Sequence, residues 1–213
     1  MRIDALDLSH WNEVTNFTEV ADAGVVGVIH KATEGHTYVD KTYAPRMRQA
    51  LDAGLKWGSY HFLKHGNVAA QMKHYLKYAK AEPGARVCID YEDPACTLSD
   101  LHEAVAAIAG IDDSLQIAIY TGHLLKEQLG DKHDRQLSRC SLWLAQYTAG
   151  EPSWPKGTWE HWSLWQFTDG DVGGSPREVP GVSSPMDCNE FNGNKQACAQ
   201  WFGPVAADSD LVA

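Results

Sequence analysis

Two carboxylates in one short segment are the residues of this chain best suited to chemistry. Asp90 and Glu92 follow the apolar run Val87–Ile89. If that run is a β-strand, alternate side chains point to opposite faces, so Asp90 and Glu92 share a face with Cys88 and have about 6.5 Å between their Cα atoms. Like charges at that spacing raise the pKa of one group, as a general acid at neutral pH requires. Taken alone, such a segment is more often a solvated acidic loop than a catalytic pair.

Further carboxylates in other strand-like runs weaken the loop interpretation. Asp7 lies near the end of the apolar run Ile3–Leu8, and Asp187 lies in the last such run, Met186–Phe191. With the pair described above, this places four carboxylates in three separate runs. Barrel active sites form at the C-terminal ends of strands, so we expect the four groups to meet there and to be catalytic.

Aromatic and polar side chains recur near the ends of the same runs. Each alone is more typical of packing than of ligand contact. Together they predict a concave polar cleft with aromatic walls, which suits a polysaccharide. The candidate substrate-binding residues are Tyr60, Tyr120, Tyr147, Trp143, Trp165, Gln166, Lys31, Glu34 and Asn189.

The elements that must position these residues follow the period of repeated βα units. Tyr60, Asp90 and Tyr120 sit near the ends of successive runs and are thirty residues apart each time, the length of a strand, a helix and two loops. The predicted strands are Ile3–Leu8, Val25–His30, Lys56–Phe62, Arg86–Tyr91, Gln116–Thr121, Leu142–Tyr147, Ser163–Phe167 and Met186–Phe191. Helices are predicted over Val14–Ala23, Tyr43–Ala53, Val68–Ala79 with Asn67 as its N-cap, Leu101–Ala109 and His123–Leu129.

Beyond Tyr147 the pattern changes, because turn-rich stretches such as Gly170–Pro185 leave too little room for amphipathic helices. The last three strands are therefore expected to be joined by loops, and antiparallel pairing becomes possible there. The predicted fold class is α/β, a modified TIM-like barrel with about eight strands and five helices. We expect one catalytic domain over residues 1–203 and a flexible C-terminal tail over 204–213.

Composition excludes several classes of function. The chain has 18 basic and 28 acidic residues and a formal net charge of −10, which argues against a nucleic-acid partner. No stretch approaches the roughly 18 apolar residues that span a bilayer, and no signal peptide is visible before Asp7. The five cysteines include no C-x-x-C, which favours free buried thiols over a disulfide scaffold or a zinc site. We expect no metal and no cofactor.

Eight short motifs occur in order along nearly the whole chain, and together they are specific although no single one is decisive. They are D-x-S-x-W at Asp7–Trp11, K-A-T-E-G at Lys31–Gly35, G-x-Y-H-F at Gly58–Phe62, D-Y-E at Asp90–Glu92, I-Y-T at Ile119–Thr121, W-x-A-x-Y at Trp143–Tyr147, W-Q-F at Trp165–Phe167 and D-x-N-x-F at Asp187–Phe191. This set resembles glycoside hydrolase family 25, the CH-type lysozymes or N-acetylmuramidases. His10 and Trp11 stand where other members vary.

The resemblance implies a barrel of eight strands and five helices. It also implies hydrolysis of the β-1,4 bond between N-acetylmuramic acid and N-acetylglucosamine in bacterial peptidoglycan. By position, Glu92 matches the proton donor of the family and Asp90 matches the acid beside it. The other matches are Asp7, an acid that orients substrate and tunes charge, Asp187, a cleft acid, and Tyr60 and Tyr147, whose hydroxyls line the cleft.

The mechanism stays open at this stage. The family is regarded as retaining, which requires either an enzyme nucleophile or the 2-acetamido group of the substrate. Carboxyl pairs are about 5–5.5 Å apart in retaining enzymes and about 6.5–9.5 Å apart in inverting ones, and the backbone spacing of Asp90 and Glu92 falls between. We favour substrate assistance, with Asp90 or Asp187 stabilising the intermediate.

Two alternative functions and two routes of delivery to the cell wall are consistent with parts of the sequence. A catalytically silent glycan-binding barrel is disfavoured because both Asp90 and Glu92 are present. A chitinase-like glycosidase is disfavoured because the longer D-x-x-D-x-D-x-E signature is absent. The chain is expected to be a monomer that is made in the cytoplasm and acts on the cell wall after release. It resembles phage endolysins that await a holin, and an injected interbacterial toxin is the alternative.

Overall fold

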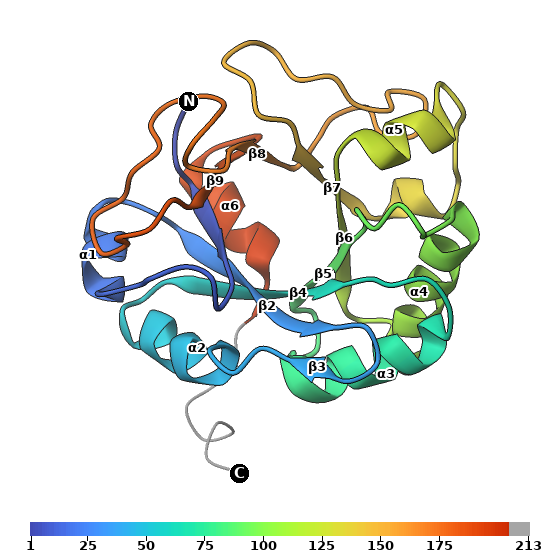
Figure 1. Cartoon of the computed structure of the whole chain (residues 1–213), viewed down its shortest axis with the longest axis horizontal. Coiled ribbons are helices and arrows are strands. Elements are labelled where there is room, and N and C mark those ends of the chain that lie inside the picture. Colours follow the sequence, from blue (N-terminus) through green and yellow to red (C-terminus); the bar gives the residue numbers. More distant parts are fainter. Residues whose placement is uncertain (205–213) are drawn as a thin grey trace.

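The computed structural model describes residues 1–204, and its centre is a closed barrel of eight strands (Figure 1). Neighbouring strands follow the order β1-β9-β8-β7-β6-β5-β4-β2, and β1 closes the ring by pairing with β2. The strands are β1 (Ala5–Leu8), β2 (Gly27–Glu34), β4 (Lys56–Phe62), β5 (Arg86–Asp90), β6 (Gln116–Thr121), β7 (Ser141–Ala145), β8 (Leu164–Thr168) and β9 (Asp187–Phe191). All eight predicted strands are present, so the predicted barrel is confirmed.

The five predicted helices lie between strands, and a sixth follows the last strand (Figure 1). The five are α1 (Phe17–Asp22), α2 (Tyr43–Asp52), α3 (Val68–Ala79), α4 (Leu98–Ile111) and α5 (His123–Leu129). The additional elements are α6 (Lys195–Phe202), a 3₁₀ turn (Leu137–Arg139) and the two-residue strand β3 (Tyr38–Val39), which pairs antiparallel with β2 outside the ring.

Asn67 occupies the predicted N-cap position of α3 but does not cap the helix with its side chain. Its backbone is left-handed, with φ of 48°, and its side chain makes no capping hydrogen bond. Helix α4 shows the arrangement expected of a capped helix: Thr97 Oγ1 accepts from the Asp100 N–H, and the Asp100 carboxylate accepts from the Thr97 N–H.

The last strand runs against the direction of its neighbours. β9 pairs antiparallel with both β8 and β1, whereas the other ring pairs are parallel. The antiparallel pairing that the loop-rich C-terminal part suggested is thus confirmed. Because β9 is reversed, its first residue, Asp187, lies beside Asp7 at the end of the barrel where the parallel strands finish.

The core has two layers, as strand alternation predicts. Val87, Ile89 and Tyr91 belong to the outer layer between the sheet and the helices, whereas Cys88 belongs to the barrel interior. Phe202 of α6 fills the N-terminal end of that interior. A Cβ on Gly27, the first residue of β2, would come within 2.8 Å of the Phe202 ring, so glycine is needed where the helix closes the barrel.

The five cysteines are free and buried, as predicted. Within residues 1–204, no helix has the length and apolar character needed to cross a lipid bilayer. The same residues contain no group of three or more His, Cys, Asp or Glu side chains placed to hold a metal ion. The predicted tail, 204–213, lies outside the described residues from residue 205 onward.

Candidate active site

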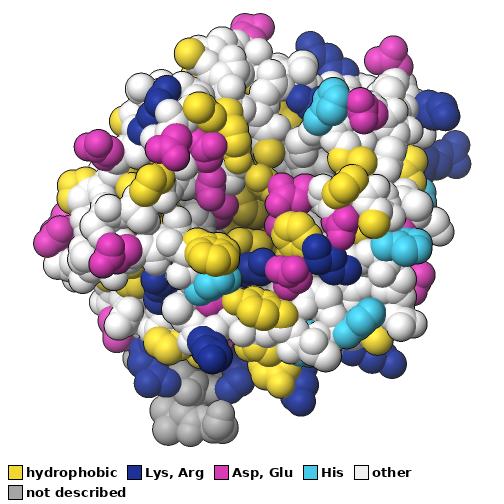
Figure 2. Space-filling model, in the orientation of Figure 1, with side chains coloured by type: hydrophobic (Ala, Val, Ile, Leu, Met, Phe, Trp, Pro, Cys, Tyr) yellow, Lys and Arg dark blue, Asp and Glu magenta, His cyan; other side chains and the backbone are white. Residues whose placement is uncertain are grey.

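A cavity of about 160 Å³ opens where the parallel strands end. The face shown in Figure 2 is hollowed near its centre, and acidic and hydrophobic side chains border the hollow. All four predicted catalytic carboxylates line the cavity, together with five of the nine predicted substrate-binding residues. The lining residues are Asp7, Tyr60, Asp90, Glu92, Tyr120, Trp143, Tyr147, Gln166 and Asp187.

Asp7 is the most firmly held of the four acids. Gln166 Nε2 donates to both of its carboxylate oxygens at 3.0 Å, and Asn189 Nδ2 donates to Oδ2 at 2.8 Å. Burial raises the pKa of Asp7 to about 6, and hydrogen bonds from Asn189, Gln166 and Asp187 limit the rise. Asp7 is therefore largely ionised at neutral pH although it is buried.

Asp187 carries the proton that Asp7 lacks. Its pKa is raised to about 9, first by burial and next by the negative charge of Asp7, its partner across the β1–β9 pairing. A carboxyl that is protonated at neutral pH can donate its O–H, and Asp7 accepts that hydrogen bond. The two acids therefore hold one negative charge between them at neutral pH.

Gln166 fixes the orientation of this arrangement. Its Oε1 accepts from the Tyr120 hydroxyl at 2.7 Å and from the Tyr147 hydroxyl at 3.0 Å. The amide must therefore turn its N–H₂ group toward Asp7. The hydroxyl proton of Tyr120, a predicted substrate ligand, is engaged inside the protein, whereas Tyr147 is 41% exposed and stands at the edge of the cavity.

Asn189 lies behind the cavity wall and acts on Asp7 rather than lining the space. Its Oδ1 accepts from the indole N–H of Trp143 at 2.7 Å, which orients its amide N–H₂ toward Asp7. Trp143 packs edge-on against Tyr120 and Tyr60, with ring centroids 4.6 Å and 6.3 Å away. Two of the predicted ligand residues thus build the wall that positions the acids.

Asp90 and Glu92 form the second acidic pair. Asp90 is 5% exposed, and its Oδ1 is buried without a hydrogen-bond partner among the described residues. Burial and the nearby charge of Glu92 raise the pKa of Asp90 well above its ordinary value. Glu92 is more exposed, at the mouth of the cavity. Partial burial raises its pKa, while the charges of Lys31 and Lys64 oppose the rise. Both shifts favour the protonated form of these carboxyls, as a general acid requires.

Lys31 and Glu34 lie at the rim and bind each other. Lys31 Nζ is 2.6 Å from Glu34 Oε2 and lies 5.0 Å from the centroid of the Phe62 ring. Lys64, which the sequence left unassigned, bridges Glu34 and Asp93 at 3.6 Å and 3.3 Å. Neither Lys31 nor Glu34 lines the cavity. The positive charges of Lys31 and Lys64 act on the site by opposing the rise in the pKa of Glu92.

Trp165 lies on the other side of the sheet from the cavity. Alternation along β8 turns Gln166 inward and Trp165 outward, where its N–H donates to the Gln146 carbonyl at 2.8 Å and its ring packs against Trp162. This position disagrees with the prediction that Trp165 contacts substrate in the cleft. The alternation of side chains along β8 is the sequence signal that distinguishes Trp165 from Gln166.

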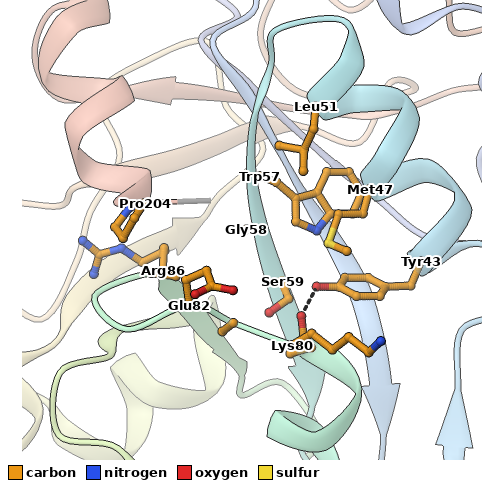
Figure 3. Close-up of a pocket in the computed structure, with 13 residues that line it drawn as sticks. Tyr43, Met47, Leu51, Trp57, Gly58, Ser59, Lys80, Glu82, Arg86 and Pro204 are labelled. Carbon is orange, nitrogen blue, oxygen red and sulfur yellow. Dashed lines mark hydrogen bonds between the residues drawn. The ribbon is translucent and has the colours of Figure 1, made fainter. Parts of the chain in front are cut away.

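A second hollow, between α2, β4 and Pro204, is too small for a ligand (Figure 3). It has a volume of about 20 Å³ and is lined by side chains that include Tyr43, Met47 and Trp57. The Tyr43 hydroxyl donates to the Ala79 carbonyl at 2.8 Å. A space of this size holds at most about one water molecule.

A barrel with acidic pairs at the ends of its parallel strands, one of them holding a proton at neutral pH, is the architecture of a barrel glycoside hydrolase. The family model described as glycosyl hydrolases family 25 matches residues 6–174. The chain belongs to this family and is a glycoside hydrolase.

Two curated relatives are similar over most of the chain. Lysozyme M1 of Streptomyces globisporus is 24% identical over 90% of this chain, which spans 68% of that protein. The N,O-diacetylmuramidase of Chalaropsis sp. is 25% identical over 84% of this chain, which spans 94% of its length.

Solved structures share the fold. The bacterial lysozyme from Streptomyces coelicolor superposes with a TM-score of 0.81 at 21% identity, covering 95% of this chain and 97% of that one. The CTP1L endolysin superposes with a TM-score of 0.72 at 22% identity, covering 92% of this chain and 68% of that one.

Proposed function

We propose that this chain is a lysozyme of the N-acetylmuramidase type, which hydrolyses the β-1,4 bond between N-acetylmuramic acid and N-acetylglucosamine in peptidoglycan. The observation that carries the proposal is the single cavity in which four acids meet with raised pKa values, around an Asp90 oxygen that no described residue binds. The names of the relatives, lysozyme and N,O-diacetylmuramidase, support the substrate class.

Glu92 is the proton donor in this proposal. It stands at the mouth, where a glycan strand can pass, and a bound sugar would exclude water from it and favour its protonated form. Glu92 gives its proton to the glycosidic oxygen as the bond from that oxygen to C1 breaks. The acetamido oxygen of the sugar that carries C1 then bonds to C1. Water later adds to C1 as it gives a proton to the Glu92 carboxylate and the bond from C1 to the acetamido oxygen breaks, so the configuration is retained and Glu92 is protonated again.

The other three acids support the positive charge of that intermediate. Asp90, once Glu92 holds the shared proton, is an anion at the base of the cavity, and Asp7 is a second anion held by three donors. Asp187 stays protonated and donates a hydrogen bond to Asp7, so it adds no further negative charge to the cavity. Tyr60 and Tyr147 are the side chains that contact the acetamido-bearing sugar.

The biological role that fits this proposal is lysis of a bacterial cell wall, in the manner of an endolysin, a name that one of the structural neighbours carries. Delivery from the cytoplasm by a holin or by injection stays a prediction. So do the monomeric state and the single catalytic domain over residues 1–203.

Digestion of purified peptidoglycan tests the proposed function. We expect new reducing ends, and borohydride reduction followed by acid hydrolysis should convert N-acetylmuramic acid, not N-acetylglucosamine, into its alcohol. Chitin incubated in parallel should stay intact. Cleavage of chitin would favour a chitinase-like enzyme, and binding of peptidoglycan without release of ends would indicate a silent barrel.

A further inference from the structure

The loop after β1 displays an indole ring in solvent. The Trp11 side chain is 82% exposed, more than any other large hydrophobic residue in residues 1–204. It lies three residues beyond the end of β1, at the end of the barrel where the parallel strands finish and the cavity opens. A single exposed hydrophobic residue is ordinary on a protein surface, and its significance here depends on how the loop is held.

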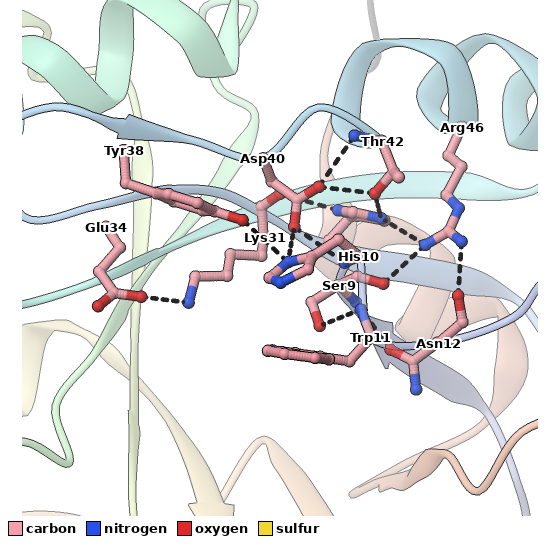
Figure 4. A network of polar contacts seen from close by, with 11 residues as sticks. Ser9, His10, Trp11, Asn12, Lys31, Glu34, Tyr38, Asp40, Thr42 and Arg46 are labelled. Atoms are coloured by element: carbon pink, nitrogen blue, oxygen red, sulfur yellow. Dashed lines mark hydrogen bonds and ion pairs between the residues drawn. The ribbon is translucent and has the colours of Figure 1, made fainter.

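The backbone on both sides of Trp11 is clamped by an arginine from another element (Figure 4). Arg46 of α2 donates from Nη1 to the Ser9 carbonyl at 2.7 Å and from Nη2 to the Asn12 carbonyl at 2.6 Å. The His10 N–H donates to the carboxylate of Asp40 at 2.9 Å. The loop is thus fixed at three backbone positions around a side chain that is left in water.

Asp40 is itself a fixed anion. It is 2% exposed and also accepts from the Thr42 hydroxyl and N–H, at 2.6 Å and 2.9 Å. Burial alone would raise its pKa, but the hydrogen bonds from Thr42 and His10 outweigh burial and hold the pKa below its ordinary value. A buried carboxylate that stays ionised gives the loop a stable anchor.

Two further rings extend the surface from Trp11. The His10 ring lies 4.6 Å from the Trp11 ring and 5.8 Å from the Tyr38 ring, measured between centroids. His10 Nδ1 is 3.0 Å from both the Asp40 carboxylate and the Tyr38 hydroxyl, which fixes the plane of the imidazole. Tyr38 is 39% exposed and belongs to the added strand β3. Trp11, His10 and Tyr38 therefore form a continuous row of rings whose middle member is held in place.

The chemistry of this row fits a sugar ring. A pyranose presents C–H groups on its faces, which pack on aromatic rings, and hydroxyls at its edge, which the Tyr38 hydroxyl and the Lys31–Glu34 pair can bind. The cavity of about 160 Å³ is smaller than the roughly 300–1,000 Å³ that encloses a drug-sized ligand. A polysaccharide that reaches the acids must therefore lie partly on the rim.

We propose that Trp11, supported by His10 and Tyr38, forms a stacking subsite for a sugar of the glycan strand that lies outside the catalytic cavity. The subsite contacts a sugar away from the scissile bond, so it contributes to binding only when the glycan strand is long enough to reach it. This inference depends on the proposed function, because it takes a glycan strand as the ligand.

The test compares Trp11→Ala and Trp11→Phe on peptidoglycan glycan fragments of graded length. Trp11→Ala should raise KM about tenfold on long strands, the size expected when a buried aromatic contact is removed, and leave kcat within about twofold. The effect should vanish for the shortest fragments that are cleaved, and Trp11→Phe should fall between. Tyr78→Ala, which removes a 38%-exposed ring from α3, is the matched control and should change neither constant.

Calorimetric titration of long strands into Glu92→Gln and Glu92→Gln/Trp11→Ala gives a readout that does not need turnover. The double variant should bind about tenfold more weakly. Equal affinity of the two, or an equal loss of kcat for every fragment length, would overturn the subsite and leave Trp11 with a structural role. Wild-type protein that binds strands but cleaves none would instead contradict the proposed function.

Discussion

The cavity holds four carboxyl groups, and burial raises the pKa of each of them. Asp187 donates a proton in a hydrogen bond to Asp7, and the shifts of Asp90 and Glu92 favour their protonated forms. Apparent pKa values then belong to each pair rather than to one residue. At the scale of single residues, function depends on which carboxyl keeps the proton when substrate is bound.

Glu92→Gln should abolish turnover and leave the fold and glycan binding nearly intact. The amide has the same shape but no acidic proton for the leaving oxygen, and general acid catalysis typically contributes about 10²–10⁴-fold. Release of reducing ends from peptidoglycan measures this loss, and Glu103→Gln on α4 is a control that should keep full activity. Retention of more than about a tenth of wild-type turnover would place the acid elsewhere.

Asp90→Asn should lower activity and move the alkaline limb of the pH–rate profile to lower pH. In the wild type, burial and the neighbouring negative charge both oppose loss of the last proton of the pair. The amide removes that charge, so Glu92 loses its proton at lower pH. The profile of kcat/KM shows the shift, and an unchanged alkaline limb would mean that the two groups titrate independently.

At the scale of elements, strand direction decides which residues meet. The sequence placed Asp187 at the beginning of a strand, the end that faces away from the mouth in a parallel barrel. Reversal of β9 brings it to Asp7. The contact between Gln166 and Asp7 joins residues 159 positions apart. Local patterns predict strands and their alternation, but such a distant pairing depends on closure of the ring.

The elements that the sequence analysis missed are those with the weakest periodic signal. β3 has two residues, too few to show alternation. α6 did carry a signal, because Asn194 caps it by accepting from the Ala197 N–H at 2.8 Å, and Cys198, Trp201 and Phe202 recur at helical spacing. Gln166 points into the cavity, so the alternation of side chains along β8 puts its neighbour Trp165 on the outer face of the sheet.

Phe202→Ala should lower the free energy of unfolding by about 3–5 kcal/mol, because it empties the space where α6 closes the barrel. Urea unfolding followed by circular dichroism measures the change. Phe202 contacts the N-terminal end of the barrel, so kcat at low temperature should remain close to that of the wild type. A loss below about 1 kcal/mol would show that α6 contributes little to closure.

At the scale of the whole molecule, the acidic cavity makes stability depend on pH. Asp187 has a pKa of about 9 in the folded state against 3.8 when unfolded, so the folded chain binds more protons and its stability falls as pH rises. His30 and His61, with pKa values lowered to about 4 by burial, act oppositely but only below their ordinary value of 6.5. We therefore expect the free energy of unfolding to decline between pH 6.5 and pH 9.

Asp187→Asn should remove part of that decline while it reduces activity. The amide can still donate to Asp7, but it cannot ionise, so the variant should be more stable than the wild type by about 1 kcal/mol or more at pH 8. Thermal and urea unfolding at a series of pH values measure the slope. Asp171→Asn, in the exposed loop after β8, should leave it unchanged. Equal slopes for wild type and Asp187→Asn would show that Asp187 is ionised in the folded protein.

The Gln166 amide also connects the surface of the enzyme to its interior. Tyr147, exposed at the edge of the cavity, donates to Oε1, and the other end of the same amide donates to Asp7. Hydrogen bonds in series polarise one another, by about 10–30% per bond. A sugar hydroxyl that donates to the Tyr147 oxygen on docking would strengthen the phenol as a donor, polarise the amide and deepen the hold on the Asp7 anion. Binding of substrate at the edge of the cavity would therefore alter the hydrogen bonding of the buried Asp7 carboxylate through one tyrosine and one amide.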